Sequence, residues 1–236
     1  MTPETTYQEN YSDTRPRKGT QALTRWLAYA SLGGSGCFTV CVLALHVLES
    51  NFNPLDHAMS DYAHGRIGWL VTVGLLALGL GSLALTSGLA RTLHGPSARI
   101  GQGCLAIWGL CGLVAAIFSD DLPGHWNTPS LSGSLHASAA QIATIVVSIA
   151  AFLLAWSVRR DPRWHRCARL LLTLAIATLV GLVLLELSFL PVLISAHPPI
   201  LFGLLERIFF VAALSWLAVA AIGLLQTMDD TTISVR

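Results

Sequence analysis

The strongest constraint on this chain is a set of six apolar segments of about 19 to 25 residues, joined by short polar connections. A helix of that length, rising 1.5 Å per residue, crosses about 30 Å of hydrocarbon. The segments are Trp26–Leu48, Ile67–Ala90, Ile100–Phe118, Leu135–Ser157, Leu170–Leu190 and Leu201–Gln226. They lack the alternation of apolar and polar residues typical of membrane β-barrel strands. The sequence therefore predicts an all-α, polytopic membrane protein with six transmembrane helices.

Composition supports a chain that lies mostly within a membrane. Of 236 residues, 53% are hydrophobic and 11% are charged, whereas about 25% are charged in an ordinary soluble domain. The connections are too short to fold as further domains. We predict a disordered cytoplasmic tail over residues 1–25, a six-helix membrane bundle over residues 26–226, and a second cytoplasmic tail over residues 227–236.

The cations predict the orientation of the bundle in the cell membrane. Of 14 Lys and Arg residues, all but Arg66 and Arg207 lie in the N-terminal tail, the second loop, the fourth loop and the C-terminal tail. With six spans these four segments share one side, and short basic loops stay cytoplasmic. Both termini are therefore expected in the cytoplasm. The same rule and anionic lipid headgroups explain the basic run "RRDPRWHRCAR", so nucleic-acid binding is not expected.

On this map, the other polar residues gather at the outer side of the membrane. For residues in the loops, such as Glu49, Asp56 and His125, plain solvation is one explanation. The outer group comprises His46, Glu49, Asp56, His57, Asp61, His64, Asp120, Asp121, His125, His136, Glu186, His197, Glu206 and Arg207.

The connection "NPLDHAMSDYAHGRIGW" is the most polar part of this outer group. Asn53 and Pro54 suit the start of a helix. In a helix, His57, Asp61 and His64 would share one face, with Ser60 beside that stripe. Imidazole and carboxylate groups at this spacing can ligate a divalent cation or act together as acid and base. A solvated loop remains the alternative.

A second polar cluster joins the third and fourth spans. In "IFSDDLPGHWNTPSLSGSLHASAA", Asp120 and Asp121 end the third span and His136 begins the fourth. Asp120 and His136 should therefore lie at similar depth, where they could complete a site with Asp61. We expect Asp61 to point into an outward-facing cavity, with His57 or His64 on its side and Asp120 and His136 across from it.

Three charged residues fall within the last two predicted spans. A charge in hydrocarbon costs several kcal/mol unless it is paired or hydrated, so Glu186, Glu206 and Arg207 should face a partner or a cavity. The sequence predicts a structural ion pair between Glu186 and Arg207, with Glu206 either joining it or facing the pocket.

The segments "HAMSDYAHGRIGWL", "IFSDDLPG" and "GSLHASAAQIA" resemble the bacterial membrane proteins of the domain-of-unknown-function family numbered 998. The match extends over nearly all of Leu27–Leu225, and Ser60–Asp61, Asp120–Asp121 and Gly133–His136 carry it. The resemblance implies six helices with these polar signatures. It implies no chemistry, because the family is named for having none established.

Two classes of function remain open on the sequence alone. In the first, the protein is a metal-assisted hydrolase of the outer leaflet that acts on a lipid-linked or membrane-proximal substrate. In the second, it is a non-enzymatic transport, sensor or assembly component that uses Glu186, Glu206 and Arg207. Membrane lipids are the expected partners of either, and the sequence does not identify protein partners. The candidate catalytic residues are Ser60, His57, Asp61, Asp120 and His136, and the candidate ligands of a zinc ion are His57, Asp61, His64, Asp120 and His136.

Overall fold

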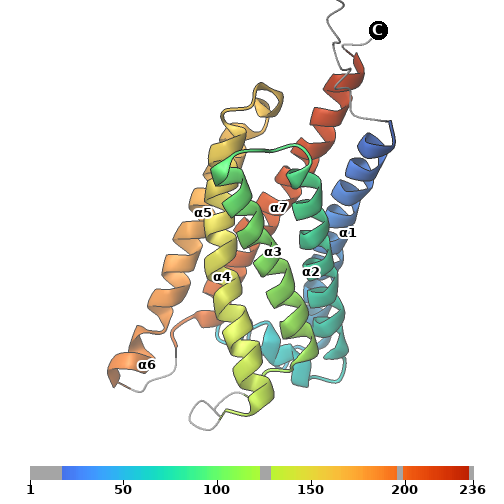
Figure 1. Ribbon diagram of the computed structural model, residues 1–236. Helices are drawn as coiled ribbons and strands as arrows, with labels where there is room; N and C mark the ends of the chain where they lie inside the picture. Colours follow the sequence, from blue (N-terminus) through green and yellow to red (C-terminus); the bar gives the residue numbers. More distant parts are fainter. Residues whose placement is uncertain (1–17, 123–128, 196–198, 234–236) are drawn as a thin grey trace, which may run out of the picture.

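The protein contains six helices long and apolar enough to cross a membrane, within the residues 18–122, 129–195 and 199–233 that the computed structural model describes (Figure 1). They are α1 (Lys18–Leu48), α2 (Trp69–Ala90), α3 (Pro96–Ile117), α4 (Leu131–Val158), α5 (Ala168–Ser188) and α7 (Phe202–Ile233). Three short elements join them: the 3-10 helices η1 (Ser60–His64) and η2 (Pro162–Trp164), and the helix α6 (Leu190–Ser195). The predicted all-α class and the number of spans are confirmed.

The first and last helices of the chain, α1 and α7, extend beyond the predicted apolar segments. α1 begins at Lys18 and α7 ends at Ile233, so residues 18–25 and 227–233 are helical although they were expected in the two tails. Adding a residue to an existing helix needs no new nucleus, so a stable apolar helix readily extends into a polar flank. The predicted boundaries enclose only the apolar residues that would lie in hydrocarbon. The helices α1 and α7 are longer than those apolar segments.

The two ends of the bundle differ in character. α1 begins and α7 ends at the same end, together with the α2–α3 and α4–α5 connections (Figure 1). The opposite end, called the η1 end below, carries η1 and α6. An even number of spans places the termini together in this way. Their location in the cytoplasm remains a prediction from the basic loops.

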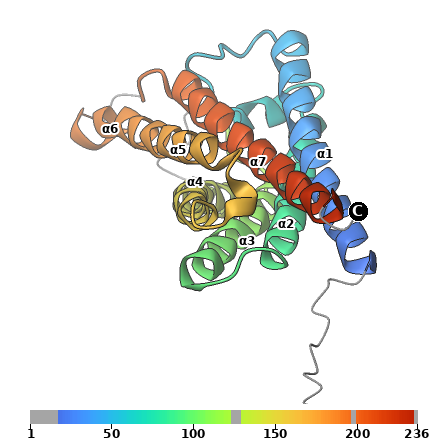
Figure 2. The ribbon, with the colours of Figure 1, turned by 90° about the horizontal axis from the view of Figure 1, so that it is seen from above.

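The helices pack as a ring in which α7 closes the circle. Each of α1 to α5 packs against the next, and α7 packs against both α5 and α1. Figure 2 shows α7 running between α5 and α1. It is the most buried of the spans, with Phe209, Trp216 and Leu224 fully enclosed. Because α7 has few contacts with α2 and α4, space is left inside the ring.

Glycines bring the backbones of α2 and α3 close together. A Cβ added to Gly79 would lie 2.8 Å from the carbonyl oxygen of Gly109, and one added to Gly109 would lie 2.9 Å from that of Gly79. Neither backbone can yield without moving a helix. This close approach explains the glycine-rich segments of these two spans as packing surfaces.

Candidate functional site

The α1–α2 connection, residues 49–68, forms turns followed by η1, and not the predicted amphipathic helix. Asn53 favours the turn because its Oδ1 accepts a hydrogen bond from Leu55 N at 3.1 Å. A side chain that bonds its own backbone in this way competes with helix formation. His57 therefore precedes η1 and His64 ends it, so the stripe predicted from their spacing is not formed.

Buried acids hold this connection against the bundle. The carboxylate of Glu49, only 5% exposed, accepts from Ile67 N at 2.8 Å. The carboxylate of Glu206, on α7, accepts from Met59 N at 2.7 Å. Tyr62 lies at the centre of the connection and is 1% exposed. The connection is thus a packed part of the fold, and plain solvation is the wrong explanation for Glu49.

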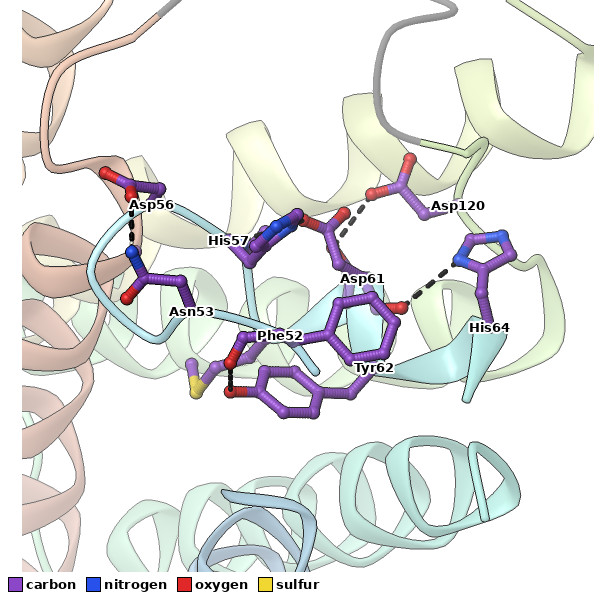
Figure 3. A network of polar contacts seen from close by, with 12 residues as sticks. Phe52, Asn53, Asp56, His57, Asp61, Tyr62, His64 and Asp120 are labelled. Atoms are coloured by element: carbon purple, nitrogen blue, oxygen red, sulfur yellow. Dashed lines mark hydrogen bonds and ion pairs between the residues drawn. The ribbon is translucent and has the colours of Figure 1, made fainter. Parts of the chain in front are cut away.

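His57 and Asp61 form a hydrogen-bonded pair within the connection (Figure 3). Nδ1 of His57 lies 3.0 Å from Oδ2 of Asp61, and the same oxygen accepts from Ala58 N at 3.0 Å. In the tautomer that carries its proton on Nδ1, His57 donates to this oxygen and Nε2 keeps its lone pair. About a third of the His57 side chain is exposed.

The surroundings of Asp61 disfavour its charge. Burial raises the pKa of this carboxyl above its ordinary value of 3.8, and the hydrogen bonds from His57 and Ala58 N partly offset that rise. The neighbouring carboxylate of Asp120 raises it further. Asp61 and Asp120 are therefore close enough to repel each other, as expected for two acids that face one cavity.

The second cluster meets the first through Ser60. The Ser60 hydroxyl donates to Oδ2 of Asp120 at 2.8 Å, which joins η1 to the residues that follow α3. His136, on α4, directs Nδ1 toward the carbonyl oxygens of Ala115 at 3.0 Å and Phe118 at 2.8 Å. Its Nε2 lies 4.0 Å from Oδ2 of Asp120. The α1–α2 and α3–α4 connections thus converge.

Arg207 fixes the other side of the connection. Its Nη1 donates to the carbonyl oxygen of His57 at 2.9 Å, and its Nε donates to Nε2 of His46 at 2.7 Å. Nδ1 of His46 lies 2.6 Å from the carbonyl oxygen of Val42, so the ring donates there and accepts from the guanidinium. An imidazole that both donates and accepts in this manner is neutral. Nη1 also lies 3.9 Å from the carboxylate of Glu206.

Glu186 does not pair with Arg207. Its carboxylate accepts from Nε2 of Gln141 at 2.6 Å, which joins α5 to α4. Arg207 is instead surrounded by partners from α1 and the α1–α2 connection. The prediction of a Glu186–Arg207 ion pair is wrong because depth along a helix was matched without knowledge of the direction in which each side chain points. Only the approach of Glu206 to Arg207 agrees with it.

A cavity of about 1250 Å³ occupies the ring at the η1 end. His57, Asp61, Asp120 and His136 are among its lining residues. Farther into the bundle the wall becomes apolar, with Phe38, Leu78, Trp108 and Phe210. Figure 3 shows Asp120 beside Asp61 and His57 of the connection. The chamber is therefore amphipathic, with a polar mouth and an apolar interior.

The geometry does not fit the predicted metal site. Among the residues described, no three His, Cys, Asp or Glu side chains are grouped so as to hold one ion. His64 directs Nδ1 toward the backbone oxygen of Asp61 at 3.3 Å, away from the carboxylates. His136 presents only one nitrogen to Asp120. His125 and His197, which belong to the outer polar group, lie outside the described residues.

The comparison with known families agrees with the resemblance noted in the sequence. The family described as "Protein of unknown function (DUF998)" matches residues 32–223. The chain belongs to the DUF998 family. No curated protein and no solved structure matches it. The matched range of this DUF998 protein contains every residue of the site described above, but the family description assigns them no activity.

Sequence reasoning overlooked several residues that organise this site in the DUF998 protein. Gln141 is a neutral residue within an apolar span, and nothing in the sequence marks it as the partner of Glu186. Tyr62 is flanked by polar residues in the sequence, yet it is buried and its ring lies at an angle to that of Phe52 with centroids 5.0 Å apart. His46, in the last turn of α1, was included in the outer polar group, but its contact with Arg207 was not predicted.

Proposed function

We propose that the protein is a membrane-embedded hydrolase in which His57 and Asp61 act as an acid–base pair on a membrane-resident amphiphile. The observation that carries this proposal is the 3.0 Å contact between His57 Nδ1 and the Asp61 carboxylate at the mouth of a large amphipathic cavity. A carboxylate that holds Nδ1–H leaves Nε2 able to take a proton, which is the arrangement used by general bases.

The reaction follows from that arrangement. Nε2 of His57 removes a proton from water, and the water oxygen bonds to the carbonyl carbon of an ester or amide. The bond from that carbon to the leaving oxygen or nitrogen then breaks, and the imidazolium of His57 returns the proton to the leaving group. Asp61 stabilises the imidazolium while it exists. The step consumes one water and needs no redox partner.

Ser60 and Asp120 are assigned to positioning of the substrate. The Ser60 hydroxyl donates a hydrogen bond to Asp120. The oxygen of Ser60 therefore keeps lone pairs that can accept a hydrogen bond from a hydroxyl or amine of the substrate. On the α4 side of Asp120, Nε2 of His136 lies 4.0 Å from the same carboxylate. No step is assigned to zinc, because the described side chains do not group around one ion.

The test uses water as the reporter, since the substrate is unidentified. Protein in phosphatidylcholine nanodiscs containing a bacterial lipid extract is incubated in ¹⁸O-labelled water, and lipid products are searched for ¹⁸O by mass spectrometry. We expect labelled products with the wild type, reduced by about 10²- to 10⁴-fold in His57→Ala. His165→Ala is the matched control, because His165 is exposed beside η2 at the other end of the bundle.

Two results would reject the hydrolase. One is the absence of labelled products with the wild type, and the other is equal labelling by the wild type and His57→Ala. Either would favour the second class of function, in which the cavity binds a ligand for transport, sensing or assembly without converting it.

A further inference from the structure

The cavity at the η1 end carries a strong imbalance of charge. Six acidic side chains line it, and no Lys or Arg of the described residues does so. The basic side chains in the described lining are all histidines, namely His46, His57 and His136. The acidic residues of the lining are Asp56, Asp61, Asp120, Asp121, Glu186 and Glu206.

The nearest cation, Arg207, approaches only one of these acids, because its Nη1 lies 3.9 Å from the carboxylate of Glu206. Arg207 directs its guanidinium to His46 and to the carbonyl oxygens of His57 and Gly203, and it is not part of the cavity wall. It lies beside a separate apolar groove on the α1–α7 surface. Arg207 thus holds the backbone of the connection and approaches one acid, Glu206, while the other five acids of the lining have no Lys or Arg beside them in the described cavity wall.

An acidic chamber selects the head of its ligand. A phosphate or carboxylate head beside Asp61 and Asp120 would face like charges where burial weakens screening by water. An ammonium head would gain charge-assisted hydrogen bonds with the same carboxylates. Removing either carboxylate from water is costly unless a partner is supplied, and an ammonium group supplies it.

The rest of the chamber selects a long apolar chain. Its volume of about 1250 Å³ exceeds the usual range of about 300 to 1,000 Å³ for small-molecule pockets. The interior is lined by aromatic and aliphatic side chains such as Phe38, Leu78 and Trp108. A polar ligand would leave this wall unused, whereas an alkyl chain would fill it.

The chamber also reaches the surface that faces lipid. Gln141 on α4 and Glu186 on α5 both line it, both are exposed, and they are bonded across the gap between these helices. Ile142, also part of the lining, is 48% exposed. A molecule dissolved in the bilayer can therefore reach the chamber sideways, between α4 and α5, without crossing the polar connections.

We propose that the chamber binds a cationic amphiphile, a single-chain amine whose ammonium group lies between Asp61, Asp120 and Glu206 and whose alkyl chain extends toward Trp108. The claim that such an amine is the substrate rests on the proposed hydrolase, because the bond broken would then belong to that molecule. The claim that the chamber binds such an amine rests on the cavity alone. Glu186 and Gln141 would meet the head as it passes between α4 and α5.

The experiment compares three probes that differ only in the head. Diazirine-bearing hexadecylamine, hexadecanol and hexadecyl phosphate are each photolysed with the protein in phosphatidylcholine nanodiscs. Labelling at Trp108 and Phe210, inside the chamber, is divided by labelling at Val183, which is 51% exposed on the lipid-facing side of α5. The ratio removes differences in partitioning among the probes.

We expect the ratio for the amine to exceed that for the phosphate by at least about tenfold, the effect of about 1.4 kcal/mol of charge complementarity. The alcohol should lie between them. In Asp61→Asn/Asp120→Asn the amine should fall to the level of the alcohol, while Asp161→Asn, at the other end of the bundle, should behave as wild type. Equal or stronger labelling by the phosphate or the alcohol in the wild type would overturn the proposal, whether or not the double variant folds.

This outcome is separable from that of the hydrolase. Binding of the amine without ¹⁸O incorporation would keep the ligand class and reject hydrolysis. Labelled hydrolysis products from lipids without an amine, together with no preference for the amine probe, would keep the hydrolase and reject the ligand class.

Discussion

Replacing Arg207 by Met should release the α1–α2 connection from the bundle. Arg207 is 16% exposed in its side chain and donates to the carbonyl oxygen of His57, to Nε2 of His46 and to the carbonyl oxygen of Gly203. Met keeps most of the volume and removes every donor. The change therefore leaves the carbonyl oxygen of His57, the imidazole of His46 and the Glu206 carboxylate without this partner.

The cost can be estimated from these contacts. Hydrogen bonds to a charged group contribute about 1.5 to 3 kcal/mol each, and breaking a buried charge cluster costs about 3 to 5 kcal/mol. The bond to Gly203 lies within α7, and water can reach part of the cavity mouth. These two facts place the expected loss near the lower end, at about 3 kcal/mol.

The measurement is the free energy of unfolding in mixed detergent micelles, with Arg99→Met as the control because Arg99 is an exposed arginine of α3. An exposed substitution should stay within about 0.5 kcal/mol of the wild type. Proteolysis within residues 49–68 should also become faster in Arg207→Met and unchanged in the control. Equal stability and equal protease resistance of the two variants would refute the role given to Arg207.

Three further predictions concern pH, packing and topology. Burial raises the pKa of Asp61 above 3.8. Between the unfolded-state and folded-state pKa values, the folded protein therefore binds more protons, and its stability falls as the pH rises. The thermal midpoint of Asp61→Asn should rise relative to that of the wild type over this pH interval, and the difference should persist at neutral pH. Gly109→Ala, whose Cβ meets the α2 backbone, should cost about 1 to 3 kcal/mol of unfolding free energy, whereas Gly103→Ala, with open space around it, should gain about 0.5 to 1 kcal/mol. A membrane-impermeant maleimide should label Asn51→Cys but not Arg160→Cys in intact cells, and the reverse pattern would invert the assigned sides.

The spans were predictable because length and hydropathy alone decide which segments can lie in hydrocarbon. That argument located all six helices, but it did not predict how far α1 and α7 continue into polar sequence, nor that α3 and α4 begin four residues before their predicted starts. It also brought Asp61, Asp120 and His136 to one end of the bundle, because residues at span ends must share a depth. The cavity lined by all three residues agrees with that expectation.

The side-chain contacts were not predictable by the same means. Depth does not state the direction of a side chain, so Glu186 was paired with Arg207 when its neighbour is Gln141. Helical spacing was applied to a segment where Asn53 favours a turn, so His64 was expected beside Asp61 and instead faces the backbone. The first error applied depth along single helices to a contact between helices, and the second applied α-helical spacing to a segment that forms turns and a 3-10 helix.

The distribution of ionisable groups favours chemistry or binding at one face over conduction through the bundle. Within the described spans, His46, Glu186, Glu206 and Arg207 all lie toward the η1 end. Beyond the cavity floor, the centre of the bundle is packed with apolar side chains such as Leu85, Trp216 and Leu224, each at most 1% exposed. A proton or ion path needs polar groups that continue across the hydrocarbon. A chamber that opens at one face and ends against a dry core is suited to holding an amphiphile whose head stays at the membrane surface while its chain lies among the helices.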